Sequence, residues 1–213
     1  MSTFTTTMSP EQRVSMAFEL LQAGSKKEYI GGEMTQLDHA LQAAQLVKNE
    51  GADEETVLAA LTRDIGFQIP VKDIMGLTGG NYYIFYTITD RAGNTSAVDH
   101  DRVGAAYLRK LGFSKKTCEL IESDVLAKRY LSTIAPVYQE SLNNASRELL
   151  KLQGGPLSST EMREFEKDPL FKQKVQFRKW NDAARTTGVK PPALDAYRDM
   201  ATRNVLMSMR MPY

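Results

Sequence analysis

Residues that typically begin and end helices alternate along this chain with stretches in which apolar residues recur every three or four positions. Ser9-Pro10, Thr35 and Asp53 each precede such a stretch, and Gly24 and Gly112 each follow one. A capping side chain before a run of this period, and a glycine after it, are typical of an α-helix. The pattern therefore predicts an all-α bundle of eight or nine helices with short connections.

We expect a single domain over residues 1–213, with a core at about 29–185 and a C-terminal helix at about 193–210. Beyond the three helices that follow the caps named above, the expected helices cover about 99–111, 114–130, 138–152, a short segment after Ser158 or Ser159, 171–185 and 194–209. The periodicity shows no internal repeat, which excludes a solenoid of stacked repeats.

Residues 66–98 interrupt the helical pattern. Glycines and a proline punctuate this stretch, and residues 81–90 (NYYIFYTITD) are aromatic and β-branched, which favours a strand. Residues 90–94 (DRAGN) are suited to a turn. We expect an inserted loop with a short β-hairpin, either packed on the domain or acting as a lid over a site.

Composition excludes several classes of protein. Lys and Arg number 27 against 26 Asp and Glu, a net charge of +1, which argues against a nucleic-acid-binding surface. No run of about 18 apolar residues exists to span a membrane, and the N-terminus lacks the pattern of a secretory signal. The single cysteine, Cys118, lies on an apolar helical pattern, where we expect a buried and unreactive thiol. These features together indicate a cytoplasmic protein.

The chain has only two histidines, His39 and His100, and each stands in a recurrent spacing to acidic residues. Asp64 follows His39 by 25 residues, and Asp124 follows His100 by 24 residues. A histidine taken alone is more often structural than functional. The interpretation of His39 and His100 as site residues therefore depends on their spacing to the acidic residues.

With their neighbours, these residues resemble the HD-domain family of metalloproteins. The resemblance is strongest to its mixed-valent di-iron oxygenases, which cleave small hydroxy-phosphonates and have myo-inositol oxygenase as a distant relative. The matching segments span about 29–185 and are Gly31-Gly32-Glu33, Gln36-Leu37-Asp38-His39-Ala40-Leu41, Leu61-Thr62-Arg63-Asp64-Ile65-Gly66, Gly104-Ala105-Ala106-Tyr107-Leu108, Ala127-Lys128-Arg129-Tyr130-Leu131, Leu152-Gln153-Gly154-Gly155-Pro156 and Arg178-Lys179-Trp180-Asn181-Asp182.

The resemblance implies a two-metal site with six ligands, of which this chain keeps half. The family uses a histidine, an adjoining His-Asp pair, two further histidines and a late aspartate. His39, Asp64 and His100 keep the family's residue types at their positions. The three remaining positions hold Arg63, Asp124 and Asn181.

A guanidinium is permanently cationic and has no lone pair to give to a metal. Arg63 therefore either enters the pocket and takes over the charge of the missing metal, or turns to solvent and leaves a wet pocket. The second metal position keeps Asp64, His100 and Asp124, a set able to bind a single Fe, Mn, Zn or Mg ion. We expect at most one Fe or other divalent metal rather than two irons.

The part of the site that binds an anion is better retained. By resemblance, Lys128, Ser146 and Arg178 hold the phosphonate end of the substrate, because lysine and arginine form charge-assisted hydrogen bonds with such oxygens. Tyr29 and Glu33 fall on a loop that in the family gates the metal and reads the substrate amine. Each residue taken singly is better explained as a solvated surface charge, but together they favour a pocket for a small anion.

Three hypotheses follow. The first is an HD-domain protein with a degenerate metal site that binds a small phosphonate-like or phosphate-like anion. The second is an enzyme with one metal at Asp64, His100 and Asp124, acting as an oxygenase or a phosphohydrolase. The third is a structural or interaction protein whose methionine-rich tail contacts a partner, although packing of this tail on its own core is the simpler expectation. The tail methionines are Met200, Met207, Met209 and Met211. The oligomeric state stays open.

Overall fold

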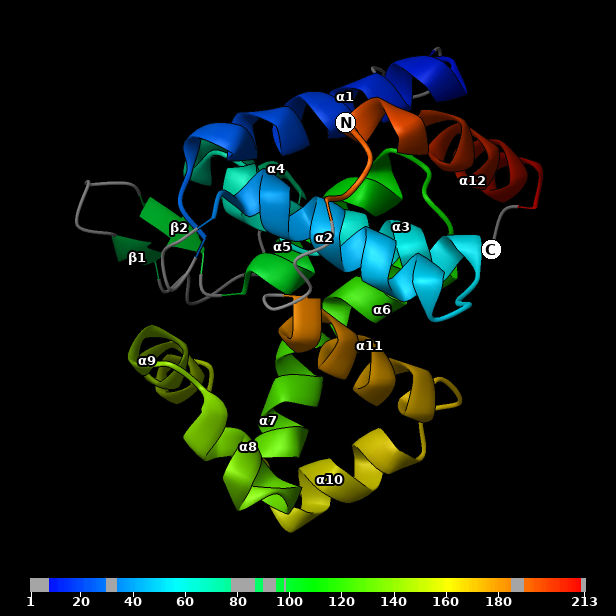
Figure 1. Cartoon of the computed structure of the whole chain (residues 1–213). Coiled ribbons are helices and arrows are strands. Elements are labelled where there is room, and N and C mark those ends of the chain that lie inside the picture. Colours follow the sequence, from blue (N-terminus) through cyan, green and yellow to red (C-terminus); the bar gives the residue numbers. More distant parts are fainter. Residues whose placement is uncertain are drawn as a thin grey trace.

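The computed structural model of the chain describes residues 8–29, 34–77, 87–89, 95–97, 99–184 and 190–211. These residues form twelve α-helices, three short 3-10 helices and one antiparallel pair of strands (Figure 1). The predicted all-α bundle is confirmed.

The α-helices are α1 (Pro10–Ala23), α2 (Gln36–Asn49), α3 (Glu54–Thr62), α4 (Val71–Leu77), α5 (His100–Lys110), α6 (Lys115–Glu122), α7 (Asp124–Ile134), α8 (Pro136–Ser141), α9 (Asn144–Leu152), α10 (Ser159–Glu166), α11 (Phe171–Ala183) and α12 (Arg198–Arg210). The 3-10 helices are η2 (Gly24–Lys26), η3 (Ile65–Gln68) and η5 (Leu194–Tyr197). The strands are β1 (Thr87–Thr89) and β2 (Thr95–Ala97).

The capping residues explain where the helices begin. At the start of α2 the Thr35 hydroxyl accepts the main-chain N–H of Asp38, and the Asp38 carboxylate accepts the N–H of Thr35 in return. Asp53 caps α3 alone, and reciprocal pairs like that of α2 also begin α1, at Ser9, and α10, at Ser158. Gly112, with φ of +83°, follows the end of α5 in a conformation that favours glycine. These predicted helix ends are confirmed.

Two predicted helices are each broken in two. The segment expected as 114–130 divides at Ser123, whose hydroxyl donates to the carbonyl of Leu120. The segment expected as 138–152 divides before α9, where the Asn143 side chain accepts the N–H of Ser146. Both breaks are made by polar side chains bonding to the backbone, which helical periodicity does not reveal. The first break places Asp124 at the start of α7.

The interrupting stretch at 66–98 is more helical than predicted. The expected hairpin is confirmed, with Thr87 paired to Ala97 in an antiparallel register. The expectation of a loop is wrong at α4, which forms because Ile74 is buried against Ile69 and Val103. The predicted turn at 90–94 lies outside the described residues.

Apart from the small cluster of Ile69, Ile74 and Val103, the hydrophobic core has two parts, with α11 between them. The larger part gathers buried side chains of α1, α2, α3, α5, α6 and α12, the upper group of helices in Figure 1, together with Phe177 of α11. The smaller part is formed by Ala127, Tyr130, Leu157 and Phe165 in the lower group. Cys118 is fully buried in the larger part, and burial raises the pKa of its thiol to about 12, as expected for an unreactive cysteine.

The C-terminal methionines behave differently from one another. Met200 packs against the larger core, whereas Met207, Met209 and Met211 are exposed. The expectation that the tail packs on its own core is therefore wrong for the last three, which lie in the last turns of α12 and just after it. A partner at this tail stays a prediction. No described helix is long and apolar enough to cross a bilayer.

Candidate functional site

A small cavity of about 30 Å³ lies where the ends of several helices meet, between the two parts of the core. Its lining consists of Tyr29, Arg63, Asp64, Phe67, His100, Asp124, Lys128, Ser146, Leu149, Gln153 and Arg178. The structure thus brings together most of the site residues predicted from the sequence. His39 and Asn181 contact this wall from behind, and Glu33 lies outside the described residues.

A tight backbone approach positions the first part of the site. Arg63 and Asp64 follow the last residue of α3, and the chain then turns into η3. A Cβ atom on Gly66 would lie 1.9 Å from the carbonyl oxygen of His100, so only glycine allows η3 to pack on the start of α5. This contact brings His100 next to Asp64.

The Arg63 side chain points into the site. It is 4% exposed, and its Nη2 donates to Asp64 Oδ2 at 2.6 Å and to the Tyr29 hydroxyl at 2.9 Å. Its Nη1 lies 3.4 Å from Asp124 Oδ1. The alternative in which Arg63 turns to solvent is wrong, because the two buried carboxylates hold the guanidinium between them.

The charges continue in alternation beyond Asp124. Arg178 Nη1 donates to Asp124 Oδ2 at 2.7 Å, while its Nε and Nη2 donate to Asp182 at 3.0 and 2.7 Å. The Tyr138 hydroxyl also donates to Asp182. Asp182 lies four residues after Arg178 on α11, a spacing that predicts such a pair, although we assigned Asp182 no role from the sequence. Three carboxylates and two guanidiniums thus form one alternating row, which runs from Asp64 through Asp124 to Asp182.

The two arginines keep the central carboxylates ionised. Burial alone would raise the pKa of Asp64, but the Arg63 guanidinium, with His39 and His100, holds it well below its usual range. Burial would also raise the pKa of Asp124, but the charges of Arg178 and, to a smaller extent, Arg63 lower it. Both carboxylates therefore carry a full charge at neutral pH and are balanced inside the protein.

The two histidines lie on either side of Asp64. His39 Nε2 is 3.2 Å from the carbonyl oxygen of Asn181, which can only accept, so Nε2 donates there, and Nδ1 lies 3.6 Å from Asp64 Oδ2. His100 Nε2 lies 3.6 Å from Asp64 Oδ1. The Tyr29 ring stacks on His39 and the Phe67 ring on His100, with centroids 3.8 and 3.9 Å apart. Phe67 was missed from the sequence because it falls in the stretch without helical period.

These side chains, as arranged, do not fit a pair of metals. Arg63 Nη2 lies 2.6 Å from Asp64 Oδ2, and a guanidinium offers no lone pair to a metal. Asn181 donates its side-chain amide to the carbonyl of Phe177. Within the described part of the chain, no three His, Cys, Asp or Glu side chains are grouped to hold a metal ion. Asp64 Oδ1, which faces His100, is buried and has no hydrogen-bond partner among these residues.

Lys128 is the third basic group of the cavity. It is 3% exposed, and its Nζ donates to the main-chain carbonyl of Ser146 at 2.9 Å and to Gln153 Oε1 at 3.2 Å. Burial, with help from the nearby Arg178 charge, lowers its pKa to about 7. Ser146 thus contacts Lys128 through its backbone, and a role for its hydroxyl in holding an anion stays a prediction. Gln153 stands in a segment matched above, but we gave it no role.

Comparison with known proteins gives the family. No family model matches the chain. It is 36% identical over 191 residues to the hydroxymethylphosphonate dioxygenase of Gimesia maris, covering 89% of this chain and 86% of that protein. It is 31% identical over 184 residues to the [1-hydroxy-2-(trimethylamino)ethyl]phosphonate dioxygenase (glycine-betaine-forming) of Leisingera caerulea, covering 84% and 83%. An uncharacterized protein of Acanthamoeba polyphaga mimivirus is 32% identical over 189 residues, covering 89% and 80%. The chain therefore belongs to the family of these phosphonate dioxygenases.

Proposed function

We propose that this chain is an HD-domain protein with a degenerate metal site that binds a small phosphonate-like or phosphate-like anion. In this proposal Arg63 supplies the positive charge that metals supply in the di-iron members, and di-iron oxygenase activity is lost or altered. The observation that carries the proposal is the Arg63 guanidinium held between Asp64 and Asp124. Two buried carboxylates without a cation would cost several kcal/mol, on the order of the penalty for an unpaired buried charge.

The charge of the cavity supports an anionic ligand. Three basic side chains line it, Arg63, Lys128 and Arg178, against the carboxylates of Asp64 and Asp124. When Lys128 is protonated, its ammonium has three donors, of which two are used by protein carbonyl oxygens. The two named relatives act on phosphonates, which are anions of this kind.

Calorimetric titration of chelator-treated protein with methylphosphonate and 2-aminoethylphosphonate tests the proposal. We expect binding without metal, accompanied by proton uptake above pH 7, because a bound anion raises the pKa of Lys128. Lys128→Met should weaken binding by at least about tenfold, the loss expected for one hydrogen bond between charged groups. Lys151→Met removes an exposed lysine of α9 and should bind as the native protein does. Absence of heat with both ligands, or binding only after metal is added, contradicts the proposal.

A triple variant tests the role of Arg63 separately. Arg63→His, Asp124→His and Asn181→Asp together restore the residue types that the resemblance implies for two metals. We expect this variant to retain iron or manganese through gel filtration, measured by elemental analysis. The matched control keeps the other two changes but carries Arg63→Met, which supplies no ligand. Equal metal content in the two variants contradicts the idea that Arg63 occupies a metal position.

A single-metal enzyme is the alternative, and one observation favours it. Asp64 Oδ1 is buried without a hydrogen-bond partner among the described residues and faces His100 Nε2, as two ligands of one metal would. With Asp124 as a third ligand, such a metal would supply an activated water or bind oxygen, as in a phosphohydrolase or an oxygenase. Elemental analysis of native protein purified without chelator should then give about one equivalent of metal, and a trace amount rejects this alternative.

A further inference from the structure

The site cavity is too small for the ligand that the charges favour. Its volume of about 30 Å³ has room for about two water molecules. A phosphonate group with its carbon substituent therefore requires an opening of the cavity toward free space. The residues that line a neighbouring cavity indicate the direction of that opening.

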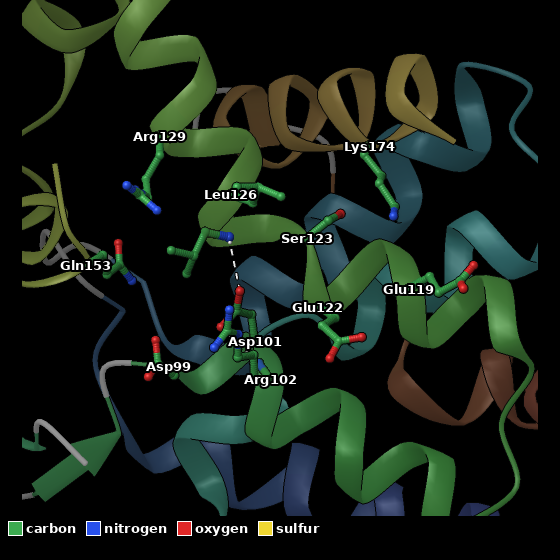
Figure 2. Close-up of a pocket in the computed structure, with 11 residues that line it drawn as sticks. Asp99, Asp101, Arg102, Glu119, Glu122, Ser123, Leu126, Arg129, Gln153 and Lys174 are labelled. Carbon is green, nitrogen blue, oxygen red and sulfur yellow. Dashed lines mark hydrogen bonds between the residues drawn. The ribbon is translucent and has the colours of Figure 1, made fainter. Parts of the chain in front are cut away.

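A second, larger cavity of about 580 Å³ lies directly against the first, and we call it the outer cavity. Figure 2 shows its lining, which consists of Asp99, Asp101, Arg102, Glu119, Glu122, Ser123, Val125, Leu126, Arg129, Gln153 and Lys174. Its lining carries both signs of charge, so it suits a polar ligand better than an apolar one.

At two places, residues next to one another in the sequence line different cavities. On α5, Asp99 and Asp101 line the outer cavity, while His100 between them lines the inner one. On α7, the two neighbours of Asp124 line the outer cavity, while Asp124 itself lines the inner one. On the outer side of the wall between the two cavities, the Asp101 carboxylate accepts the main-chain N–H of Val125, the bond drawn dashed in Figure 2. Helix backbone and ion pairs thus fix these two parts of the wall.

Gln153 is the residue that the two cavities share. Its side chain lines both cavities, and its Oε1 accepts a hydrogen bond from Lys128 at 3.2 Å. It lies at the C-terminal cap of α9 and precedes Gly154, with φ of +99°. Arg129 donates to the Gly155 carbonyl, which anchors the backbone just after Gln153.

We propose that the outer cavity is the entrance and outer subsite of the anion pocket, and that Gln153 is the gate between the two cavities. The anionic head of a small phosphonate or phosphate ester takes the place of Gln153 at Lys128, and the polar remainder of the ligand lies in the outer cavity. This inference rests on the proposed function, because it assumes that the inner cavity takes the anion.

Phosphorus NMR of methylphosphonate tests the gate, because line shapes give association and dissociation rates from the ligand itself. Gln153→Ala removes one hydrogen bond to a charged group and should raise the association rate about tenfold. Gln153→Glu places a carboxylate against Lys128 and should lower the same rate. Unchanged rates in both variants overturn the gate.

A chemical block tests the entrance. Arg102 is exposed and lines the outer cavity, so Arg102→Cys can carry a bulky maleimide there. The native Cys118 does not react, because it is fully buried and its pKa is raised to about 12. Labelling should lower the association rate at least about tenfold relative to the same variant unlabelled, if diffusion through this cavity is obligatory. Labelled Arg203→Cys, on the exposed face of α12, is the control and should keep its rate.

The outcomes separate the two proposals. Binding by the native protein, with rates that labelling leaves unchanged, overturns the entrance but keeps the proposed function. No binding by native, labelled or Gln153 variants overturns the proposed function, and this inference with it.

Discussion

Replacing Arg63 with methionine removes the cation between two buried carboxylates and keeps an unbranched side chain that fills the space of the arginine stem. Asp124 retains Arg178 at 2.7 Å, so the loss falls mainly on Asp64. Breaking a buried ion pair by removing one partner typically costs about 3–5 kcal/mol. In a chain of this size, that corresponds to a fall in melting temperature of about 6–20 °C.

The pH dependence gives this prediction its sign. In the native protein the pKa of Asp64 is held below its unfolded value of about 3.9, so its stabilising effect is present above that pH and is lost on acidification. Without Arg63, burial raises the pKa of Asp64, and the variant then loses stability as the pH rises above about 4, by up to about 1.4 kcal/mol per pH unit. The difference between native and variant should therefore be larger at pH 7.5 than at pH 4.

Thermal and urea denaturation followed by circular dichroism, in the presence of chelator, measure this difference. Arg203→Met is the matched control, because Arg203 is 53% exposed and solvent screens its ion pair with Glu54. If Arg63→Met costs no more than the control, or costs the same at both pH values, the guanidinium is not what balances Asp64.

Three further predictions concern single groups, each measured by thermal denaturation. Burial raises the pKa of Asp101 to about 8, so the native protein should lose stability as the pH rises from about 4 to 8. Asp101→Asn should lack this loss. Equal slopes of melting temperature against pH in the two proteins would refute the prediction. Burial lowers the pKa of Lys128 to about 7, so the stability of the native protein should rise between about pH 7 and 10. Lys128→Met should lack this rise, and the same rise in the variant would argue against the lowered pKa. Gly66→Ala should lower the stability by about 1–3 kcal/mol or more, because the added Cβ would clash with His100. Gly76→Ala, whose Cβ would meet nothing within 4 Å, should cost no stability. Equal melting temperatures of the two variants would contradict the close packing of η3 on α5.

The sequence predicts much of this fold because capping side chains and glycines next to the helices determine where the helices begin and end. The Thr35–Asp38 pair and Gly112 specify their helix ends within a few residues, and the structure agrees. The breaks at Ser123 and Asn143 were missed, since neither residue interrupts the apolar period. They depend on side-chain bonds to the backbone that form only in the folded chain.

The gathering of the site residues was predicted by resemblance, but their partners were not. That His39, Asp64 and His100 meet follows from the family's spacing, and the structure places them together. The direction of Arg63 stayed open, because its position at the end of α3 allows both orientations. Gln153 gave no signal from the sequence, since a glutamine at a helix end is ordinary and its place between two cavities is a property of the whole fold.

The row of alternating charges also joins the two groups of helices. Arg63 and Asp64 belong to the upper group, whereas Asp124 starts α7 of the lower group, and Arg178 lies on α11 between them. Whatever binds here competes with the contacts that bind one half of the protein to the other. A ligand that draws Arg178 away from Asp124 would therefore also weaken the contact between the two groups of helices.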